Sequence, residues 1–346
     1  MCQIREPPLW ASRTYIMYAF ESVPHRYFIN HRVRLIEICM VKRIDMIKNR
    51  IIKEMLVKGG RKVDLDTYAT SWTQNDELKD AKEETVKERA AQILEENRQS
   101  LAAAQELLYS SSAYSVLIIL QGMDAAGKDG TIRHVMSGVN PQGCRVQGFK
   151  VPTPEELGHN FLWRYSKALP LKGEIGIFNR SYYEDVLVVR VHPELIEAQH
   201  LPPGNRGNKF WGDRFKDINA FERHLDRNGT LILKFFLHMS KEEQRRRLLE
   251  RLENEDKYWK FSIADLKERG SWDDYVKAYQ ALLSATSTKW APWYIIPADH
   301  KWAARAVIAD IITTKIQALD LQYPKVNQQQ MEEIRKAREQ LKQCQA

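Results

Sequence analysis

One stretch of this chain, residues 115–136, constrains its fold more than any other. Five apolar residues at 116–120 indicate a buried strand, a glycine-flanked loop follows, and the residues after the loop suit a helix. The spacing from Gly122 to Gly127 and Lys128 matches G-x-x-x-x-G-K, in which backbone N–H groups at a helix N-terminus and a lysine bind phosphate. A chance glycine-rich turn would lack the buried strand before it. The stretch therefore predicts a phosphate-binding loop between a strand and a helix.

The residues that usually hold Mg²⁺ beside such a loop are altered in this chain. Asp129 stands where a Ser or Thr normally follows the lysine, and the apolar strand at 175–178 ends in Asn179 where an Asp is usual. Asp124, inside the loop, is the carboxylate that can replace them, because Mg²⁺ prefers oxygen ligands and keeps several waters. Its alternative role is an Asx turn. Arg180 would either face a ligand at the carboxyl end of its strand or form a structural salt bridge.

Composition narrows the class of protein. The chain has 346 residues, which suffice for one large or two small domains, and its 43% hydrophobic content supports a sizeable core. A net charge of +8 suggests a polyanionic partner, although an ordinary basic surface explains the charge equally well. No apolar run approaches the roughly 18 residues of a membrane span.

The four cysteines are Cys2, Cys39, Cys144 and Cys344. They form no C-x-x-C pair, which disfavours a zinc site or a disulfide framework and favours a reducing cytoplasm.

Residues 1–54 differ from the rest of the chain. They contain ten Lys/Arg and five Asp/Glu without sustained periodicity, and so supply +5 of the net charge. Three interpretations are open: a basic arm for a polyanion, a targeting peptide, or upstream sequence translated ahead of a true start at Met46 or Met55. We favour the last. We expect one α/β domain at 55–325 and a polar C-terminal helix or tail at 326–346.

The remaining chain alternates between apolar strand segments and amphipathic helix segments. This alternation predicts a parallel five-stranded sheet wrapped by helices. The expected strands are 116–120, 144–151, 175–178, 231–237 and 293–297. The expected helices are 79–109, the loop helix, one from 154 toward 163, 212–228, 241–254, 272–285, 301–319 and the tail from 327.

A basic segment at 241–270 follows the fourth strand. Arg247 and Arg251 are four residues apart and therefore share one face of the expected helix. Charge alone would indicate an ordinary solvated helix. Beside a phosphate loop, the segment is typical of the mobile basic lid that supplies cations to a transferring phosphoryl group and excludes water.

Two acidic residues after the third strand, Glu184 and Asp185, are either nucleotide or metal contacts or an exposed acidic turn. Other catalytic classes find no support in the sequence. The histidines show no H-x-x-x-H pairing, and no G-x-S-x-G elbow is present.

Four separated segments, in order, resemble the polyphosphate kinase 2 family. They are GMDAAGKDG, GVNPQGCRVQGFKVPTPEELGHNFLWR, IFNRSYYEDVLVVRVHPE, and KEEQRRRLLERL with KYWKFSIADL. The resemblance covers about residues 58–323, and the Asp after the loop lysine is a family trait. It implies a P-loop kinase fold, a three-layer α/β/α arrangement with a helical lid. It also implies homodimers or homotetramers and reversible transfer of phosphoryl groups between inorganic polyphosphate and nucleotides, with Mg²⁺ or alternatively Mn²⁺ as cofactor.

The resemblance assigns roles to residues that match its motifs. Asp124 is expected at metal and phosphate, and it forms a catalytic set with Lys128, Arg180, Arg247 and Arg251. The nucleotide site is expected at Asn179, Glu184 and Asp185, with Glu184 where acceptor preference is set. Phosphate contacts are expected from Gly122, Ala125, Ala126, Gly127, Lys128, Asp129 and Gly130. Independently of the resemblance, the path of a highly charged polyphosphate chain must be lined with cations, for which the candidates are Arg133, Lys150, Arg164 and Arg190. Asn160 departs from the Asp of the family's H-D-F-L-W-R pattern, so no carboxylate role is expected there.

The sequence of the third segment resembles the branch that phosphorylates both nucleoside mono- and diphosphates. We therefore expect AMP, ADP and ATP as nucleotide partners, with guanine nucleotides as further candidates, and neither nucleic acid nor membrane. The runner-up is an ATP-dependent nucleoside monophosphate kinase of the thymidylate or adenylate kinase type, disfavoured by the missing Ser/Thr after Lys128. A third class, a non-catalytic polyanion-binding protein, is suggested only by the basic charge.

Overall fold

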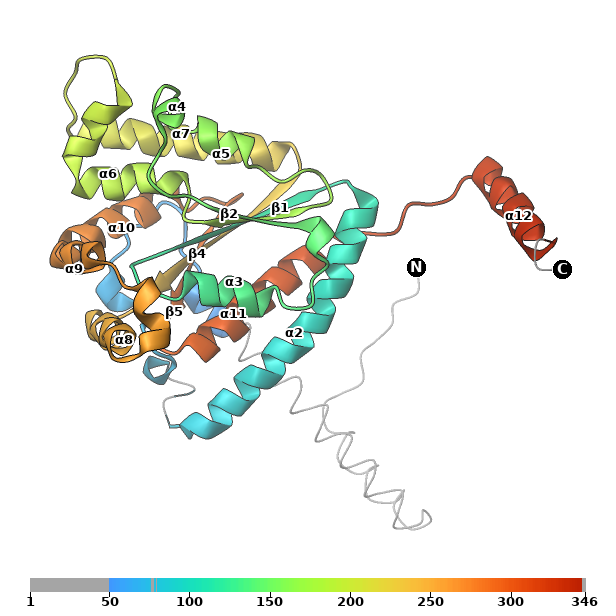
Figure 1. Ribbon diagram of the computed structural model, residues 1–346, viewed down its shortest axis with the longest axis horizontal. Coiled ribbons are helices and arrows are strands. Elements are labelled where there is room, and N and C mark those ends of the chain that lie inside the picture. Colours follow the sequence, from blue (N-terminus) through green and yellow to red (C-terminus); the bar gives the residue numbers. More distant parts are fainter. Residues whose placement is uncertain (1–49, 76–77, 79, 344–346) are drawn as a thin grey trace, which may run out of the picture. The chain divides into compact units, whose positions relative to one another are not determined.

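The structure is a computed structural model that describes residues 50–75, 78 and 80–343 (Figure 1). The chain divides into two units, Met1–Lys53 and Glu54–Ala346. Of the first unit only residues 50–53 are described, and they are helical. The predicted N-terminal extension therefore lies outside the described residues, apart from its last five.

A parallel five-stranded sheet forms the centre of the second unit, which confirms the predicted fold class. The strand order is β2-β3-β1-β4-β5. The strands are β1 (Ser115–Gly122), β2 (Cys144–Gly148), β3 (Ile175–Asn179), β4 (Thr230–His238) and β5 (Trp293–Pro297). Strand β1 is apolar and buried on both faces because neighbouring strands flank it and helices cover it. The edge strand β2 is largely exposed and ends at Gly148, so the predicted end at residue 151 is wrong.

Helices cover both faces of this sheet (Figure 1). The layer that contains the loop helix consists of α2 (Glu83–Ser111), α3 (Lys128–Val135) and α11 (Lys301–Gln317). The opposite layer contains α5 (Trp163–Lys167), α6 (Val188–Val191), α7 (Asn208–Arg227) and α10 (Trp272–Thr286). The lid segment is formed by α8 (Lys241–Glu253), the 3₁₀ helix η6 (Glu255–Lys260) and α9 (Ile263–Gly270).

The helix expected from residue 154 toward 163 is wrong as a single element. Helix α4 (Pro154–Leu157) begins with a capping box made by Thr153 and Glu156 and ends at Gly158. The chain then turns at Asn160, whose side chain accepts a hydrogen bond from the Leu162 N–H, before α5 begins. A glycine and a short polar side chain favour a turn at this point.

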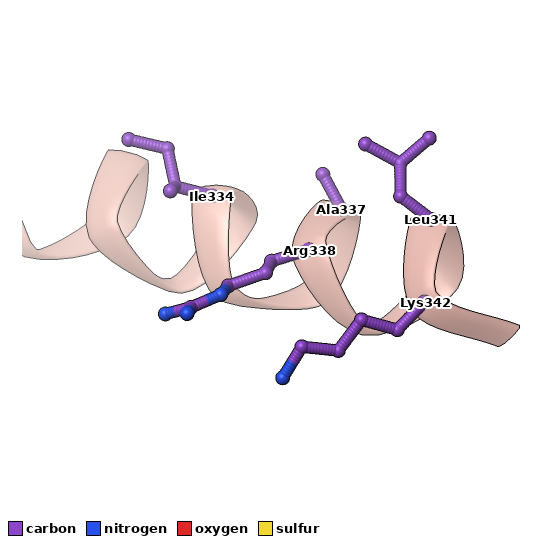
Figure 2. A pocket seen from close by; sticks show the side chains of 5 residues that line it. All are labelled: Ile334, Ala337, Arg338, Leu341 and Lys342. Atoms are coloured by element: carbon purple, nitrogen blue, oxygen red, sulfur yellow. The ribbon is translucent and has the colours of Figure 1, made fainter.

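Short 3₁₀ helices and a C-terminal helix complete the described elements. The 3₁₀ helices are η1 (Leu65–Thr67), η2 (Trp72–Gln74), η3 (Pro141–Gly143), η4 (Tyr182–Val186) and η5 (Pro193–Gln199). The C-terminal helix α12 (Gln328–Gln343) has no buried residue. A shallow pocket lies on this helix alone, and Figure 2 shows its five lining side chains on successive turns. Because every lining residue belongs to one exposed helix, this pocket is no candidate for the phosphate site.

Candidate active site

The predicted loop joins β1 to α3 at the carboxyl edge of the sheet, where parallel α/β sheets bind ligands. A Cβ atom on Gly122 would lie 3.1 Å from both the Cβ and the carbonyl oxygen of Leu237, so a side chain here would be crowded where the loop leaves the sheet. Gly127 caps α3 with φ of 103°, a left-handed conformation that favours glycine. The glycines of the motif therefore shape the loop around an open helix N-terminus.

Lys128 folds back over this loop. Its Nζ donates hydrogen bonds to the carbonyl oxygens of Gly122, at 2.6 Å, and Met123, at 3.2 Å. Loss of solvation and the nearby positive charge of Arg180 together lower the pKa of Lys128 to about 8, against the opposing charges of Asp124, Glu184 and Asp129. A phosphate at the loop would replace the two carbonyl oxygens and favour the charged ammonium.

Asp124, Arg180 and Glu184 form one connected cluster beside the loop. Arg180 Nη2 donates to Asp124 Oδ1 at 2.7 Å, and its Nη1 donates to Glu184 Oε2 at 3.0 Å. The other oxygen of Glu184 accepts a hydrogen bond from Gln121 of β1 at 2.8 Å. The two carboxylates, Glu184 first, raise the pKa of Arg180. Arg180, the predicted catalytic arginine, is thus bonded to Asp124, the predicted metal ligand. The same guanidinium also binds Glu184, a predicted nucleotide contact.

The backbone at this cluster is strained. Arg180 has φ of 66° and Ala125 of the loop has φ of 64°, both in the left-handed region that non-glycine residues rarely adopt. Such conformations persist where the surrounding structure holds them, and they concentrate at functional sites. Here they turn the Arg180 side chain and the loop backbone toward the same space.

Asn179 and Asp129, which stand where P-loop proteins usually have Mg²⁺ ligands, are hydrogen-bonded to each other. Asn179 Nδ2 donates to Asp129 Oδ1 at 2.5 Å, which links the end of β3 to the first turn of α3. The pairing follows from the register of the sheet, because Asn179 lies directly beside Leu120 of β1. Asn179 and Asp129 therefore form a matched amide–carboxylate pair at the mouth of the loop.

Arg247 of α8 is buried against the backbone of the loop. Its side chain is only 3% exposed. Its guanidinium donates to the carbonyl oxygens of Ala125, Ala126, Ala298 and Asp299, and to a carboxylate oxygen of Glu243. Loss of solvation lowers its pKa. In this arrangement Arg247 holds the backbone of the phosphate loop. The spacing of Arg247 and Arg251 in the sequence did not predict this structural role.

Arg251 joins the parts of the lid to each other. Its Nη1 donates to Asp265 of α9 at 3.0 Å, while Arg269 of α9 donates to Gln244 of α8. Gln244 in turn donates to the carbonyl oxygen of Asp124 in the loop. The lid is therefore tied to the phosphate loop through α8.

Asp185, which follows Glu184 in η4, is buried and bonds to residues outside the Asp124–Arg180–Glu184 cluster. Its two carboxylate oxygens accept hydrogen bonds from Tyr165 at 3.1 Å and Gln199 at 2.9 Å, and Arg214 binds its carbonyl oxygen. Burial raises the pKa of Asp185 to about 6. The exposed acidic turn is therefore wrong for this residue, and the nucleotide contact stays a prediction.

The cations expected to line a phosphate path differ in their surroundings. Arg133 is exposed on α3, and Lys150 is exposed after β2. Arg164 donates to the carbonyl oxygen of Lys150 and to Tyr165, so it holds the fold together. The guanidinium of Arg190 lies 5.7 Å from the ring centre of Trp211. Within the described chain, neither Lys150, Arg164 nor Arg190 is hydrogen-bonded or ion-paired to the loop.

A buried ion pair that sequence reasoning missed lies beneath η4. Lys234 of β4 is fully buried and donates to Glu222 Oε2 at 2.7 Å, to Tyr183 Oη at 2.8 Å and to the carbonyl oxygen of Thr286 at 2.7 Å. Tyr182 and Tyr183 both donate to the other oxygen of Glu222. These bonds hold Tyr182 and Tyr183, the two residues of η4 that come directly before Glu184. A lysine within an apolar strand gives little warning of such a role.

We expect Glu222→Gln to lower the free energy of unfolding by about 3–5 kcal/mol, because it leaves the buried Lys234 ammonium without its counter-charge. Urea denaturation of the full chain measures this change. The exposed pair Asp213–Lys216 of the same helix provides the control, and Asp213→Asn should leave the denaturation midpoint unaltered. A midpoint for Glu222→Gln equal to that of the control would contradict the assignment.

The acidic groups at the site are few. Among residues 50–75, 78 and 80–343, no group of three or more His, Cys, Asp or Glu side chains is placed to hold a metal ion. Asp124, whose side chain is 24% exposed, supplies one carboxylate inside the loop. This donor set suits Mg²⁺, which binds through one or two carboxylates and takes its other ligands from substrate phosphates and water.

The sheet, the phosphate loop and the helical lid define a P-loop kinase-like protein. Comparison with known families gives a match to Polyphosphate kinase 2 (PPK2) over residues 84–324. The chain belongs to the polyphosphate kinase 2 family. Kinases of this family generally depend on a divalent metal.

Individual relatives agree with this assignment. The chain is 47% identical over 290 residues to an ADP-polyphosphate phosphotransferase of Rhodopseudomonas palustris, covering 84% of this chain and 98% of the relative. It is 49% identical over 238 residues to an AMP/ADP-polyphosphate phosphotransferase of Meiothermus ruber, covering 69% and 85%. The crystal structure of polyphosphate kinase 2 from Arthrobacter aurescens TC1 superposes with a TM-score of 0.70 at 36% identity, covering 78% and 91%. No helix of the described residues is long and apolar enough to cross a membrane.

Proposed function

We propose that this protein transfers phosphoryl groups from inorganic polyphosphate to nucleoside mono- and diphosphates, making ADP from AMP and ATP from ADP, reversibly. The observation that supports this most is the meeting of the Lys128 loop with the Asp124–Arg180–Glu184 cluster at one edge of the sheet. Relatives named for ADP and for AMP/ADP cover most of the chain. Guanine nucleotides are further candidate acceptors.

The proposed mechanism needs positioning and positive charge. The acceptor's terminal phosphate, with a second pKa of about 6, is largely ionised at neutral pH, so no general base is required. Loop N–H groups and Lys128 bind the donor phosphates, and Arg180 stabilises the charge on the transferring group while the two substrates are held in line. Glu184, fixed by Gln121 and Arg180, borders the acceptor position with Asn179.

Asp124 would hold Mg²⁺, or alternatively Mn²⁺, together with phosphate oxygens. The cation neutralises negative charge between donor and acceptor when it is bound. Asp124 is at present an acceptor for Arg180. A cation on this carboxylate would weaken that ion pair and leave the guanidinium available for phosphate. A homodimeric or homotetrameric assembly and a cytoplasmic location stay predictions.

An exchange of donors tests the proposal. Purified full-length protein is given AMP or ADP, Mg²⁺ and either long-chain polyphosphate or ATP as sole donor, and products are measured by chromatography. The proposal expects ADP from AMP and ATP from ADP with polyphosphate alone. Product from AMP with ATP alone would select the monophosphate kinase alternative. Salt-sensitive binding of polyphosphate without transfer would select a non-catalytic binding protein.

The pH dependence of catalysis follows from Lys128. Its pKa of about 8 in the free protein means that the phosphate-binding ammonium is present below pH 8 and is lost as the pH rises through that value. We expect kcat/KM for polyphosphate to be level below this pH and to fall above it by about tenfold per pH unit, because kcat/KM reports groups of the free enzyme. The terminal phosphate of the acceptor has a second pKa of about 6 and is already ionised in this range, so its ionisation does not cause the fall.

Initial rates at constant ionic strength measure this profile. Lys128→Arg keeps its charge throughout and should show no such fall in its remaining activity. A wild-type profile that stays level well above pH 8 would contradict the assignment.

A further inference from the structure

Gln121 carries the last side chain of β1 before the phosphate loop, and it is only 1% exposed. In the sheet it lies beside Phe236 of β4. Residues in register on neighbouring strands point to the same face, so Gln121 faces the layer that contains α10, where Phe236 packs on Tyr279 with ring centres 4.3 Å apart. Packing therefore holds the Gln121 amide at a fixed place below the active site.

Glu184 is held by two donors, one for each of its carboxylate oxygens. Gln121 Nε2 donates to Oε1 at 2.8 Å, and Arg180 Nη1 donates to Oε2 at 3.0 Å. Because each oxygen has its own donor, rotation of the carboxylate would break both hydrogen bonds. Glu184 is thus a rigid link between the sheet and the Arg180 guanidinium.

The other end of the Gln121 amide shows which contact orients it. Among the residues that the structure describes, its buried Oε1 atom has no hydrogen-bond partner. A buried acceptor without a donor is unfavourable, and such atoms call for a specific explanation. A reversed amide would place this oxygen against the Glu184 carboxylate, which is less favourable still. The contact with Glu184 therefore fixes the orientation of the amide.

Cation binding would change what holds Arg180. Its guanidinium is bonded to Asp124 at 2.7 Å and to Glu184 at 3.0 Å. Asp124 is the proposed ligand of the divalent cation, and a cation there would weaken the first bond. Glu184 is then the carboxylate that keeps the guanidinium in place. A group that acts on the transferring phosphoryl must be held to within about 0.5 Å of its productive position.

We propose that Gln121 is a positioning residue, which acts through Glu184 to hold the Arg180 guanidinium toward the transferring phosphoryl group. This inference rests on the proposed function. Gln121 is buried and has no contact with the donor phosphates, which the loop and Lys128 bind. Its loss should therefore lower kcat and leave the KM for polyphosphate unchanged.

Gln121→Met tests this division between kcat and KM, because methionine has a similar length and lacks the amide. We expect kcat for AMP at saturating polyphosphate to fall about tenfold or more, since a displacement of about 1 Å in such a site can cost about 100-fold. The KM for polyphosphate should stay within about twofold. Gln105→Met is the matched control, because Gln105 of α2 is also 1% exposed and lies outside the site. Its kcat should equal that of the wild type.

Gln121→Glu gives a measurement that a merely structural role would not change. The protonated acid can donate to Glu184 as the amide does, whereas the ionised form repels it. We expect the ratio of variant to wild-type kcat to be near one at acid pH and to fall as the pH rises. Two adjacent carboxyl groups share a proton, so the fall should come above the usual carboxyl pKa of about 4.3. Gln142→Glu, an exposed change in η3, should give a level ratio.

An exchange of the two side chains completes the test. Gln121→Glu combined with Glu184→Gln restores an amide-to-carboxylate hydrogen bond, so it should remove the pH dependence of the ratio and recover part of kcat above neutral pH. Taking the ratio to the wild type cancels the titration of neighbouring groups that the proteins share. The charged and titratable groups around Glu184 come from the loop, the end of β3 and α10, and they are Asp124, Lys128, Arg180, Tyr275 and Tyr279.

The outcomes separate this inference from the function on which it rests. A fall in kcat at unchanged polyphosphate KM, with a pH-dependent ratio for Gln121→Glu, supports the proposal. Wild-type kcat in Gln121→Met, or a level ratio for Gln121→Glu, would overturn it while wild-type transfer from polyphosphate upholds the function. If Gln121→Met fails to fold, Gln121→Glu and the exchanged pair decide. A wild-type protein that transfers nothing from polyphosphate would overturn both.

Discussion

Lys128→Ala is expected to lower turnover of AMP with polyphosphate by at least about 100-fold, because it removes the one side-chain cation of the loop that stabilises the transferring phosphoryl group. The fold should remain intact. Within the described residues, the Lys128 ammonium donates to the carbonyl oxygens of Gly122 and Met123 in its own loop and to no other element. The kcat at saturating polyphosphate measures the first expectation, and the thermal unfolding midpoint measures the second.

The control for this variant is a surface lysine. Lys277→Ala removes a cation of α10 whose side chain is 74% exposed, and its kcat should equal that of the wild type. Near-normal turnover by Lys128→Ala would show that the loop does not bind the reacting phosphates. A collapsed unfolding midpoint would instead show that Lys128 acts through loop stability.

Asp124→Ala is expected to lower turnover by a similar factor, at least about 100-fold, because the carboxylate is proposed both to hold the divalent cation and to orient Arg180. Asp124→Asn separates these roles. The amide oxygen can still accept the hydrogen bond that Arg180 Nη2 gives to Oδ1 at 2.7 Å, but it adds no negative charge for the cation. If metal binding dominates, both variants lose turnover and need more Mg²⁺ for half-maximal activity.

The opposite pattern is informative as well. If Asp124→Asn keeps wild-type turnover and Mg²⁺ dependence while Asp124→Ala is inactive, the residue orients Arg180 and the metal ligand lies elsewhere. If Asp124→Ala is as active as the wild type, Asp124 neither holds the divalent cation nor orients Arg180. Asp213→Asn, on the exposed face of α7, is the charge control.

Much of the fold was predictable because its signals are local. Residues 116–120 are apolar without interruption, and a parallel strand buried on both faces requires this pattern. The loop motif has fixed spacing because its backbone must surround a phosphate at a helix N-terminus. Prediction failed at short elements. One helix was expected where α4 and α5 form on either side of Gly158, because no periodicity distinguishes such short segments.

The candidate site was predictable where a residue follows a strand and less so where its role depends on packing. Asp124, Arg180 and Glu184 meet because β1 and β3 are neighbours. Arg247 has the spacing of a lid cation, yet it is buried because the first turns of α8 pack on the loop. Asp185 follows Glu184 directly, but the two carboxylates have different partners, because Glu184 accepts from Gln121 whereas Asp185 accepts from Tyr165.

Residues of distant elements were the hardest to predict. Lys301 and Arg305 resemble ordinary solvent-facing cations of a helix, and only the packing of α11 beside α3 brings them to the loop. Lys234 interrupts an apolar strand, which usually weakens a strand prediction. Its partner Glu222 is on α7, and no spacing in the sequence connects the two residues.

Transfer of a labelled phosphoryl group tests the central claim most directly. Full-length protein is incubated with Mg²⁺, unlabelled AMP and ³²P-labelled polyphosphate as sole donor, beside a Lys128→Ala sample purified in the same way. The account predicts that the label appears in the β-phosphate of ADP and is almost absent with Lys128→Ala. Label that stays in polyphosphate, or that reaches ADP equally in both samples, would contradict it.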